Sequence, residues 1–270
     1  MAQRLISATF AIIITFLILF SDPRIIGICA IVLSALALYE AFKAFAFDKK
    51  PPFMILGLIA CISFQFIERL KAEYLMSALF FFVFLVCIVL IISHKKVTFI
   101  DISIFTVLLL LIPFSFTRLV YIRDYENLGS FYIWLPLIGA FCSDTGAFFV
   151  GRAFKGPKLC PELSPKKTIS GAVGGFIGSI IGFFIYSMIL IYFYKFSINY
   201  IPYYILAIIC SFTAQCGDLT ASAIKRHGQI KDFGNIMPGH GGLLDRVDSL
   251  IFTAPIVAIY LCTFMVQIFK

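Results

Sequence analysis

Long apolar runs separated by short polar connections make up most of the chain. A helix that crosses a bilayer needs about 20 apolar residues, so each run of that length predicts one crossing. The pattern predicts an all-α polytopic membrane protein with about nine transmembrane helices. No small-residue cleavage site follows the first run, so we expect it to be retained as a helix. The predicted helices span residues 4–20, 25–47, 53–70, 74–93, 99–121, 131–151, 171–194, 200–224 and 247–269.

Basic residues are distributed unevenly over the connections between these helices. The even-numbered connections carry most of the Lys and Arg residues, which predicts that they and the N-terminus face the cytoplasm. The two long polar connections, 152–170 and 225–246, both fall on that side. We therefore expect the active site at the cytoplasmic ends of the C-terminal helices. Within a single integral membrane domain, residues 1–125 would form the lipid-facing anchor and residues 126–270 the catalytic helices and loops.

The composition agrees with this assignment and excludes other classes of protein. Of the 270 residues, 61% are hydrophobic and 13% are charged, and the mean hydropathy is +1.01. An ordinary soluble domain has about 25% charged residues. The net charge of +8 does not indicate nucleic-acid binding, because the basic residues lie in short loops where they set topology and meet anionic head groups. Most of the eight Cys lie in apolar runs, so neither a disulfide framework nor a zinc site is predicted.

Glu40 and Lys43 are two charged residues near the end of the second apolar run. Their spacing of three residues brings side chains together on one face of a helix. We interpret them as a structural pair that extends toward the head-group layer.

Two aspartates in the C-terminal half lie where topology does not explain them. Asp144 falls inside the sixth apolar run, where a carboxylate costs about 2.5 to 3.5 kcal/mol and normally faces a protein interior or a wet cavity. Asp218, Ser222 and Lys225 follow one another at i, i+4 and i+7 in the eighth run, which predicts one polar stripe on an apolar helix. A simple ion pair is the alternative to a functional site on this stripe.

The connection after the sixth run has the features of an anion site. Its prolines argue against a helix, and the next helix is predicted to begin near Thr168. Free N–H groups and the macrodipole at a helix N-terminus favour a phosphate. The residues placed there are Lys166, Lys167, Thr168 and Ser170. Contact with anionic lipid explains the charges equally well, but not the prolines or the hydroxyl groups.

The stretch "KDFGNIMPGHGGLLDRVDS", residues 231–249, combines a glycine-rich loop with two aspartates. Asp245 and Asp248 lie at i and i+3 in the first turns of the last helix, where two carboxylates repel each other unless a cation is near. Mg²⁺ uses one or two carboxylates together with substrate phosphates. One or two such ions are predicted, with ligands drawn from Asp144, Asp218, Asp245 and Asp248. Structural ion pairs are the competing interpretation of these carboxylates.

These blocks resemble the phosphatidate cytidylyltransferases, or CDP-diacylglycerol synthases. The run "SAIKRHGQIKDFGNIMPGHGGLLDRVD" from Ser222 to Asp248 is similar to that family's C-terminal signature throughout. The run "DTGAFFVGRAFKGPKLCPELSPKKT" from Asp144 is similar to its second block. The chain departs from the family at Ser170 and Ala221, where Glu is common.

The resemblance implies the reaction of CTP with phosphatidate, assisted by Mg²⁺, to give CDP-diacylglycerol and pyrophosphate. It also implies a multi-pass protein of the bacterial inner membrane; homo-oligomerisation is left open. Asp218 and Asp245 would be the main metal ligands, with Asp144 and Asp248 in support. The residues expected to act in catalysis are Asp144, Lys167, Asp218, Lys225, Arg226 and Asp245. The residues expected to bind substrate are Lys166, Thr168, Ser222, Lys231, His240, Gly241, Gly242 and Arg246.

Two other functions remain open at this point. A CTP-dependent lipid kinase of polyprenol or phytol type shares part of the polar pattern. A secondary transporter would also place carboxylates in the membrane, although it would need them near the midplane in two related repeats.

Overall fold

The fold is given by a computed structural model. The structure describes residues 15, 20–67, 72–93, 97–236 and 241–264. Most of the predicted first helix, 4–20, and the predicted substrate residue His240 therefore lie outside the described residues. Contacts divide the chain into two units, Met1–Thr117 with His227–Arg246 and Arg118–Arg226 with Val247–Lys270.

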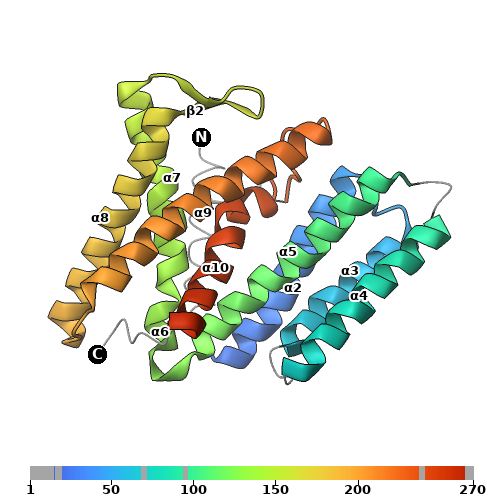
Figure 1. Cartoon of the computed structure of the whole chain (residues 1–270), viewed down its shortest axis with the longest axis horizontal. Coiled ribbons are helices and arrows are strands. Elements are labelled where there is room, and N and C mark those ends of the chain that lie inside the picture. The colour runs from blue at the N-terminus through green and yellow to red at the C-terminus, as the bar shows by residue number, and fades with distance from the viewer. Residues whose placement is uncertain (1–14, 16–19, 68–71, 94–96, 237–240, 265–270) are drawn as a thin grey trace. The chain divides into compact units, whose positions relative to one another are not determined.

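The described residues of the first unit include the helices α2 Pro23–Ala44, α3 Pro51–Ile67 and α4 Ala72–Ser93, and most of α5 Phe99–Asp124 (Figure 1). Asp22 caps α2 by accepting a hydrogen bond from the Arg24 backbone N–H at 2.8 Å, and a proline follows at the first helical position. Buried phenylalanine rings join α2, the following turn, α3 and α5, with centroids 4.5 to 6.0 Å apart. These rings belong to Phe42, Phe47, Phe53 and Phe105.

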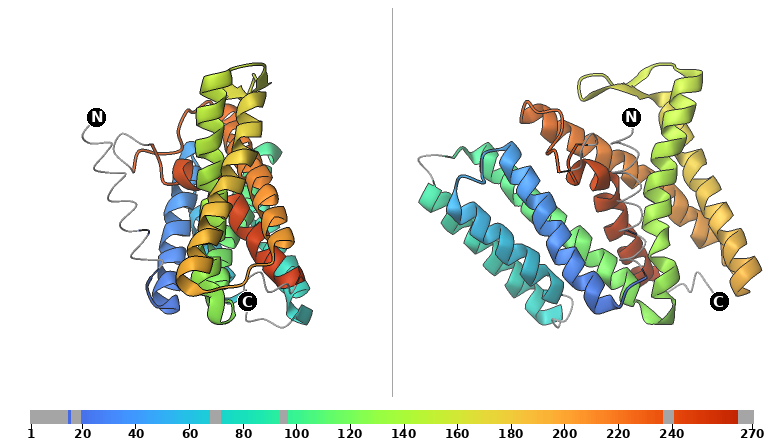
Figure 2. Two further views of the ribbon diagram at one scale, coloured as in Figure 1. Left: turned by 90° about the vertical axis from the view of Figure 1, so that its left-hand side faces the viewer. Right: turned by 180° about the vertical axis from the view of Figure 1, so that it is seen from behind.

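The second unit contains η1 Glu126–Leu128, α6 Gly129–Tyr132, α7 Trp134–Phe154, β1 Lys158–Cys160, β2 Ser164–Thr168, α8 Ile169–Tyr194, α9 Tyr200–His227 and α10 Leu244–Phe264, the last from Val247 onward. The helices α7 and α8 run side by side along their length, as the views of Figure 2 show. Several hydrogen bonds attach α10 to its neighbours. For example, Thr253 Oγ1 donates to the Pro136 carbonyl on α7, and Tyr260 Oη donates to the Pro202 carbonyl on α9.

A stripe of glycines lets α7 and α8 approach closely. Gly174, Gly178 and Gly182 recur every four residues on α8, which places them on one face. A Cβ at Gly178 would lie 2.3 Å from the Cys142 carbonyl oxygen, and one at Gly174 would lie 2.4 Å from the Val150 side chain. Small residues at a helix interface allow this kind of backbone contact in membrane proteins.

Buried and partly buried polar side chains fix the register of α7, α8 and α9. Ser143 Oγ on α7 and Ser211 Oγ on α9 are 2.9 Å apart in a hydrogen bond. Gln215 on α9 donates to Ser211 Oγ and to the Ala172 carbonyl on α8. Polar groups buried among apolar helices are costly unless they are paired, so sliding one helix would leave several of them unsatisfied.

The connection between α7 and α8 differs from the expected loop. It contains an antiparallel hairpin of β1 and β2, in which Lys158 pairs with Thr168 and Cys160 with Ser164. Apart from this hairpin, the regular secondary structure of the described residues is helical, which agrees with the predicted all-α class. The prolines of this connection correctly indicated a segment without a helix. They do not indicate whether two extended stretches of that segment pair as strands.

Each predicted segment from 25–47 onward corresponds to a helix, with ends displaced by a few residues. Among the described residues, six helices are long and apolar enough to cross a membrane: Arg24–Ala44, Met76–Ser93, Phe99–Asp124, Glu126–Phe154, Ile169–Tyr194 and Tyr200–His227. A shorter apolar helix covers Pro51–Phe66. The chain has the architecture of an integral membrane protein, and the total of nine crossings stays a prediction.

Candidate functional site

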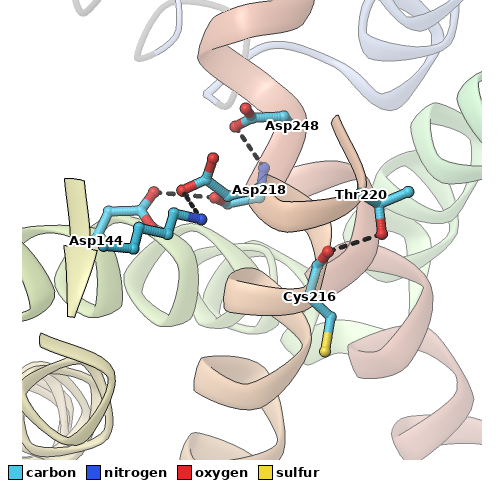
Figure 3. A network of polar contacts seen from close by, with 7 residues as sticks. Asp144, Cys216, Asp218, Thr220 and Asp248 are labelled. Carbon is cyan, nitrogen blue, oxygen red and sulfur yellow. Dashed lines mark hydrogen bonds and ion pairs between the residues drawn. The ribbon is translucent and has the colours of Figure 1, made fainter. Parts of the chain in front are cut away.

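Four predicted site residues come together in the second unit from four different elements. Asp144 lies on α7, Lys167 on β2, Asp218 on α9 and Asp248 on α10. Figure 3 shows the carboxylates of Asp144 and Asp218 turned toward each other, with Asp248 close by. Gly217 lets α9 approach the backbone of α10 closely, because a Cβ at this position would lie 2.8 Å from the Asp248 carbonyl oxygen.

Lys167 and Asp218 form an ion pair, with 2.5 Å between Nζ and Oδ2. Their side chains are 24% and 32% exposed, so water screens the pair less than on an open surface. Lys167 directly precedes Thr168, the N-cap of α8, which sets where its side chain starts. Its ammonium group is therefore held among the carboxylates, whereas a lysine that only sets topology would project into solvent.

Ser249 is a member of the cluster that sequence reasoning missed. Its Oγ donates to Asp144 Oδ2 at 3.0 Å, and its backbone N–H donates to Asp248 Oδ1 at 2.8 Å. Ser249 is buried and thus links the aspartates of α7 and α10. The only sequence signal was its position next to Asp248, and serine is too common in helices for that position to be specific.

The cluster has more negative than positive charge close at hand. Asp218 interacts electrostatically with both Asp144 and Asp248, while Lys225 partly offsets Asp248. Among the described residues, no three Asp, Glu, His or Cys side chains converge so as to enclose a metal ion by themselves. The donors present suit an ion such as Mg²⁺, which takes one or two carboxylates and completes its shell with water or phosphate oxygens.

The N-terminus of α8 lies beside this cluster. Thr168 Oγ1 accepts from the Gly171 backbone N–H at 3.1 Å, which makes Thr168 the N-cap. Ser170 Oγ donates to the Lys155 carbonyl and so ties the helix start to the end of α7. Lys166 is exposed on β2. Arg226 Nε donates to the Leu163 carbonyl at 3.3 Å, so this predicted catalytic residue holds the hairpin against α9.

Other predicted residues belong to the first unit. Asp245 Oδ2 accepts from the backbone N–H groups of Phe233 and Gly242, at 2.8 and 3.1 Å. Asp245 therefore braces the glycine loop, a role that the sequence did not suggest. Gly241 has a φ of +85°, a conformation that favours glycine. Lys231 and Arg246 are exposed.

Glu40 contradicts its interpretation as a pair with Lys43. Its side chain is 2% exposed and accepts from the Leu244 backbone N–H, whereas Lys43 is exposed. The local spacing was misleading because the true partner lies more than 200 residues along the chain, at |i−j| = 204.

Comparisons with known proteins bear on the family of the chain. A family model described as "Cytidylyltransferase family" matches residues 2–264. The chain is 30% identical over 97% of its length to a phosphatidate cytidylyltransferase of Staphylococcus aureus (strain COL), covering 99% of that protein. It is 36% identical over 167 residues to the protein of that name from Bacillus subtilis and 40% identical over 133 residues to the one from Staphylococcus haemolyticus. These two alignments span 61% and 50% of those relatives' own lengths.

Proposed function

Because the chain belongs to the cytidylyltransferase family, we propose that it transfers the cytidylyl group of CTP to phosphatidate. A phosphate oxygen of phosphatidate forms a bond to the α-phosphorus of CTP, and the bond from that phosphorus to pyrophosphate breaks. The products are CDP-diacylglycerol and pyrophosphate. The main support for the proposal is that Asp144, Asp218 and Asp248 lie close to Lys167, beside the N-terminus of α8.

The nucleophile in this reaction needs no activation by a base, because the phosphate oxygen is already negatively charged. The protein's task is to bring two polyanions into line and to offset the charge that develops on the leaving pyrophosphate. Lysines and backbone N–H groups at a helix N-terminus suit this task. Lys167 and Lys225 would contact phosphate oxygens in this scheme, with Thr168 fixing the start of α8.

The carboxylates would hold the metal ion. Asp144, Asp218 and Asp248 are the donors gathered in the second unit, and Ser249 orients two of them. A bound Mg²⁺ would neutralise phosphate charge and favour the in-line geometry. The Oδ2 atom of Asp245 accepts two backbone hydrogen bonds. A metal-ligand role for Asp245 stays a prediction from the sequence.

The cluster is set back from the ends of its helices. Asp144 lies ten residues before the end of α7 at Phe154, and Asp218 lies nine before the end of α9 at His227. At a rise of 1.5 Å per residue these positions are roughly 14 to 15 Å from the helix ends. We propose that the C-terminal ends of α7 and α9 face the cytoplasm, from which CTP arrives. Phosphatidate would enter laterally from the lipid.

The proposal is tested with purified protein, labelled CTP, phosphatidate and Mg²⁺. We expect pyrophosphate release that requires phosphatidate, and loss of about 10² to 10³ in kcat/KM for Asp218→Asn. The matched control is Asp124→Asn, at an exposed aspartate at the end of α5. Release of CDP with a polyprenol or phytol acceptor would favour the lipid kinase instead. Absence of any CTP turnover by folded protein would contradict both enzymatic readings.

A further inference from the structure

Glu40 is a buried acid in a helix that the sequence assigned to membrane anchoring. It lies on α2 in the first unit, and only 2% of its surface is exposed. Burying a carboxylate is unfavourable unless hydrogen bonds or charges compensate it. A role of α2 in membrane anchoring alone does not explain why the Glu40 carboxylate is buried.

The carboxylate of Glu40 lies inside the loop that precedes α10. Its Oε2 accepts from the backbone N–H of Leu244, the first residue of α10, at 3.0 Å. This N–H belongs to a helix N-terminus, where the macrodipole stabilises a negative charge. No described residue donates to Oε1, which is also buried. The carboxylate is thus aimed at the loop with one oxygen engaged and one available as an acceptor.

Two glycines of the loop are in contact with Glu40. A Cβ at Gly234 would lie 2.3 Å from Oε1, and a Cβ at Gly242 would lie 2.5 Å from Oε2. At each position the three nearest atoms all belong to Glu40. Neither glycine has a positive φ, so the need for glycine comes from this acid and not from the backbone conformation.

A second acid braces the same loop from within. Asp245 Oδ2 accepts from the N–H groups of Phe233 and Gly242, which lie at the two ends of the loop. Glu40 and Asp245 together engage the backbone N–H groups of Phe233, Gly242 and Leu244. At Leu244, the loop backbone is therefore held by a side chain from the N-terminal half of the chain.

We infer that Glu40 is a positioning residue that holds the described parts of the loop, residues 233–236 and 241–244, in the conformation that binds the nucleotide. The inference rests on the proposed function and on the prediction from the sequence that Lys231, Gly241, Gly242 and Arg246 bind substrate. Glu40 acts through the loop backbone and does not touch the reacting atoms. Helix α2 thus contributes to nucleotide binding as well as to anchoring.

The kinetic test compares substitutions at Glu40. Glu40→Ala removes the acceptor for Leu244 N–H, and we expect the KM for CTP to rise at least about tenfold. Glu40→Gln keeps an acceptor oxygen and the length of the side chain, so it should stay within about threefold of wild type. The KM for phosphatidate should change little in both variants. An equal rise in both KM values would overturn the inference, since it would indicate a general structural defect.

A double-mutant cycle tests the contact itself. Gly234→Ala should raise the KM for CTP because its Cβ meets Oε1, and adding Glu40→Ala should remove that clash. We therefore expect the double variant to be no worse than Glu40→Ala alone. Gly27→Ala on α2 is the control, since a Cβ there has no atom within 4 Å. Additive effects of the two substitutions would contradict the contact as the cause.

Hydrogen exchange separates this inference from the proposed function. In protein without substrates, Glu40→Ala should speed exchange at the amides of Gly242 and Leu244, while Glu40→Gln should not. Unchanged exchange in Glu40→Ala would overturn the inference, and so would faster exchange with an unchanged KM for CTP. If Glu40→Ala does not fold, Glu40→Asp takes its place, because it keeps the charge but shortens the reach. Failure of the proposed function would appear in wild-type protein as no phosphatidate-dependent release of pyrophosphate, and CTP binding would then replace KM as the readout.

Discussion

Substituting Gly178 with alanine should disturb the site through the packing of α7 against α8. The new Cβ would lie 2.3 Å from the Cys142 carbonyl oxygen and 3.0 Å from the Cα of Gly146. Ordinary contact begins near 3.4 Å, so the helices must separate locally by about 1 Å, because backbone atoms cannot rotate away. Overpacking of this kind costs about 1 to 3 kcal/mol, against which alanine recovers up to about 1 kcal/mol of helix propensity.

The separation matters because the two helices carry different parts of the site. Asp144 follows Cys142 on α7, and Lys167 directly precedes the cap of α8. A displacement of about 1 Å between reacting groups can reduce a rate about 10²-fold. We therefore expect kcat/KM to fall by about 10 to 100 fold, together with a decrease in Tm of about 2 to 4 °C per kcal/mol lost.

The assay is phosphatidate-dependent pyrophosphate release, with thermal unfolding measured on the same detergent preparation. Gly27→Ala is the matched control, because it adds a methyl group where no atom lies within 4 Å and should retain wild-type activity. If Gly178→Ala matched Gly27→Ala in both kcat/KM and Tm, close packing of α7 on α8 would not determine the site geometry, and the argument would be refuted.

Three further substitutions test single contacts. Lys167→Ala should lower kcat/KM by about 10² to 10³ in the pyrophosphate assay, and retention of activity would exclude a phosphate contact. Ser249→Ala should lower kcat/KM by about 10 to 100 fold and weaken Mg²⁺ dependence, because Asp144 loses its orienting donor; an unchanged Mg²⁺ titration would contradict this. Thr168→Val removes the acceptor for Gly171 N–H and should cost about 1 kcal/mol, seen as a lower Tm, and an unchanged Tm would contradict the capping role.

Some parts of the site could be predicted because they violate the rules of a membrane helix. Asp144 and Asp218 were visible as carboxylates in apolar runs, where insertion is costly. Thr168 was visible because a capping residue precedes an apolar run. Ser249 had no such signal, since a serine in a membrane helix ordinarily bonds to its own backbone. Each of these signals is local in the sequence.

The features that could not be predicted from the sequence depend on contacts between residues far apart in the chain. Glu40 has a plausible local partner in Lys43, and only the folded chain shows that its acceptor role is toward Leu244. The hairpin has the same origin: prolines exclude a helix, but the pairing of Lys158 with Thr168 depends on where α7 and α8 begin and end. The sequence pattern shows the periodicity of apolar residues and the polar groups that are costly to bury. It does not show which distant groups form hydrogen bonds with each other.

The attachment of the hairpin has a consequence for the reaction cycle. The hairpin is fastened to α9 at two points, by Lys167 on Asp218 and by Arg226 on the Leu163 carbonyl. If a substrate phosphate displaced Asp218 from Lys167, the hydrogen bond from Arg226 to the Leu163 carbonyl would remain. In the proposed reaction, the ammonium group would therefore exchange its carboxylate for a phosphate while the strand that carries it stays attached to α9 through Arg226.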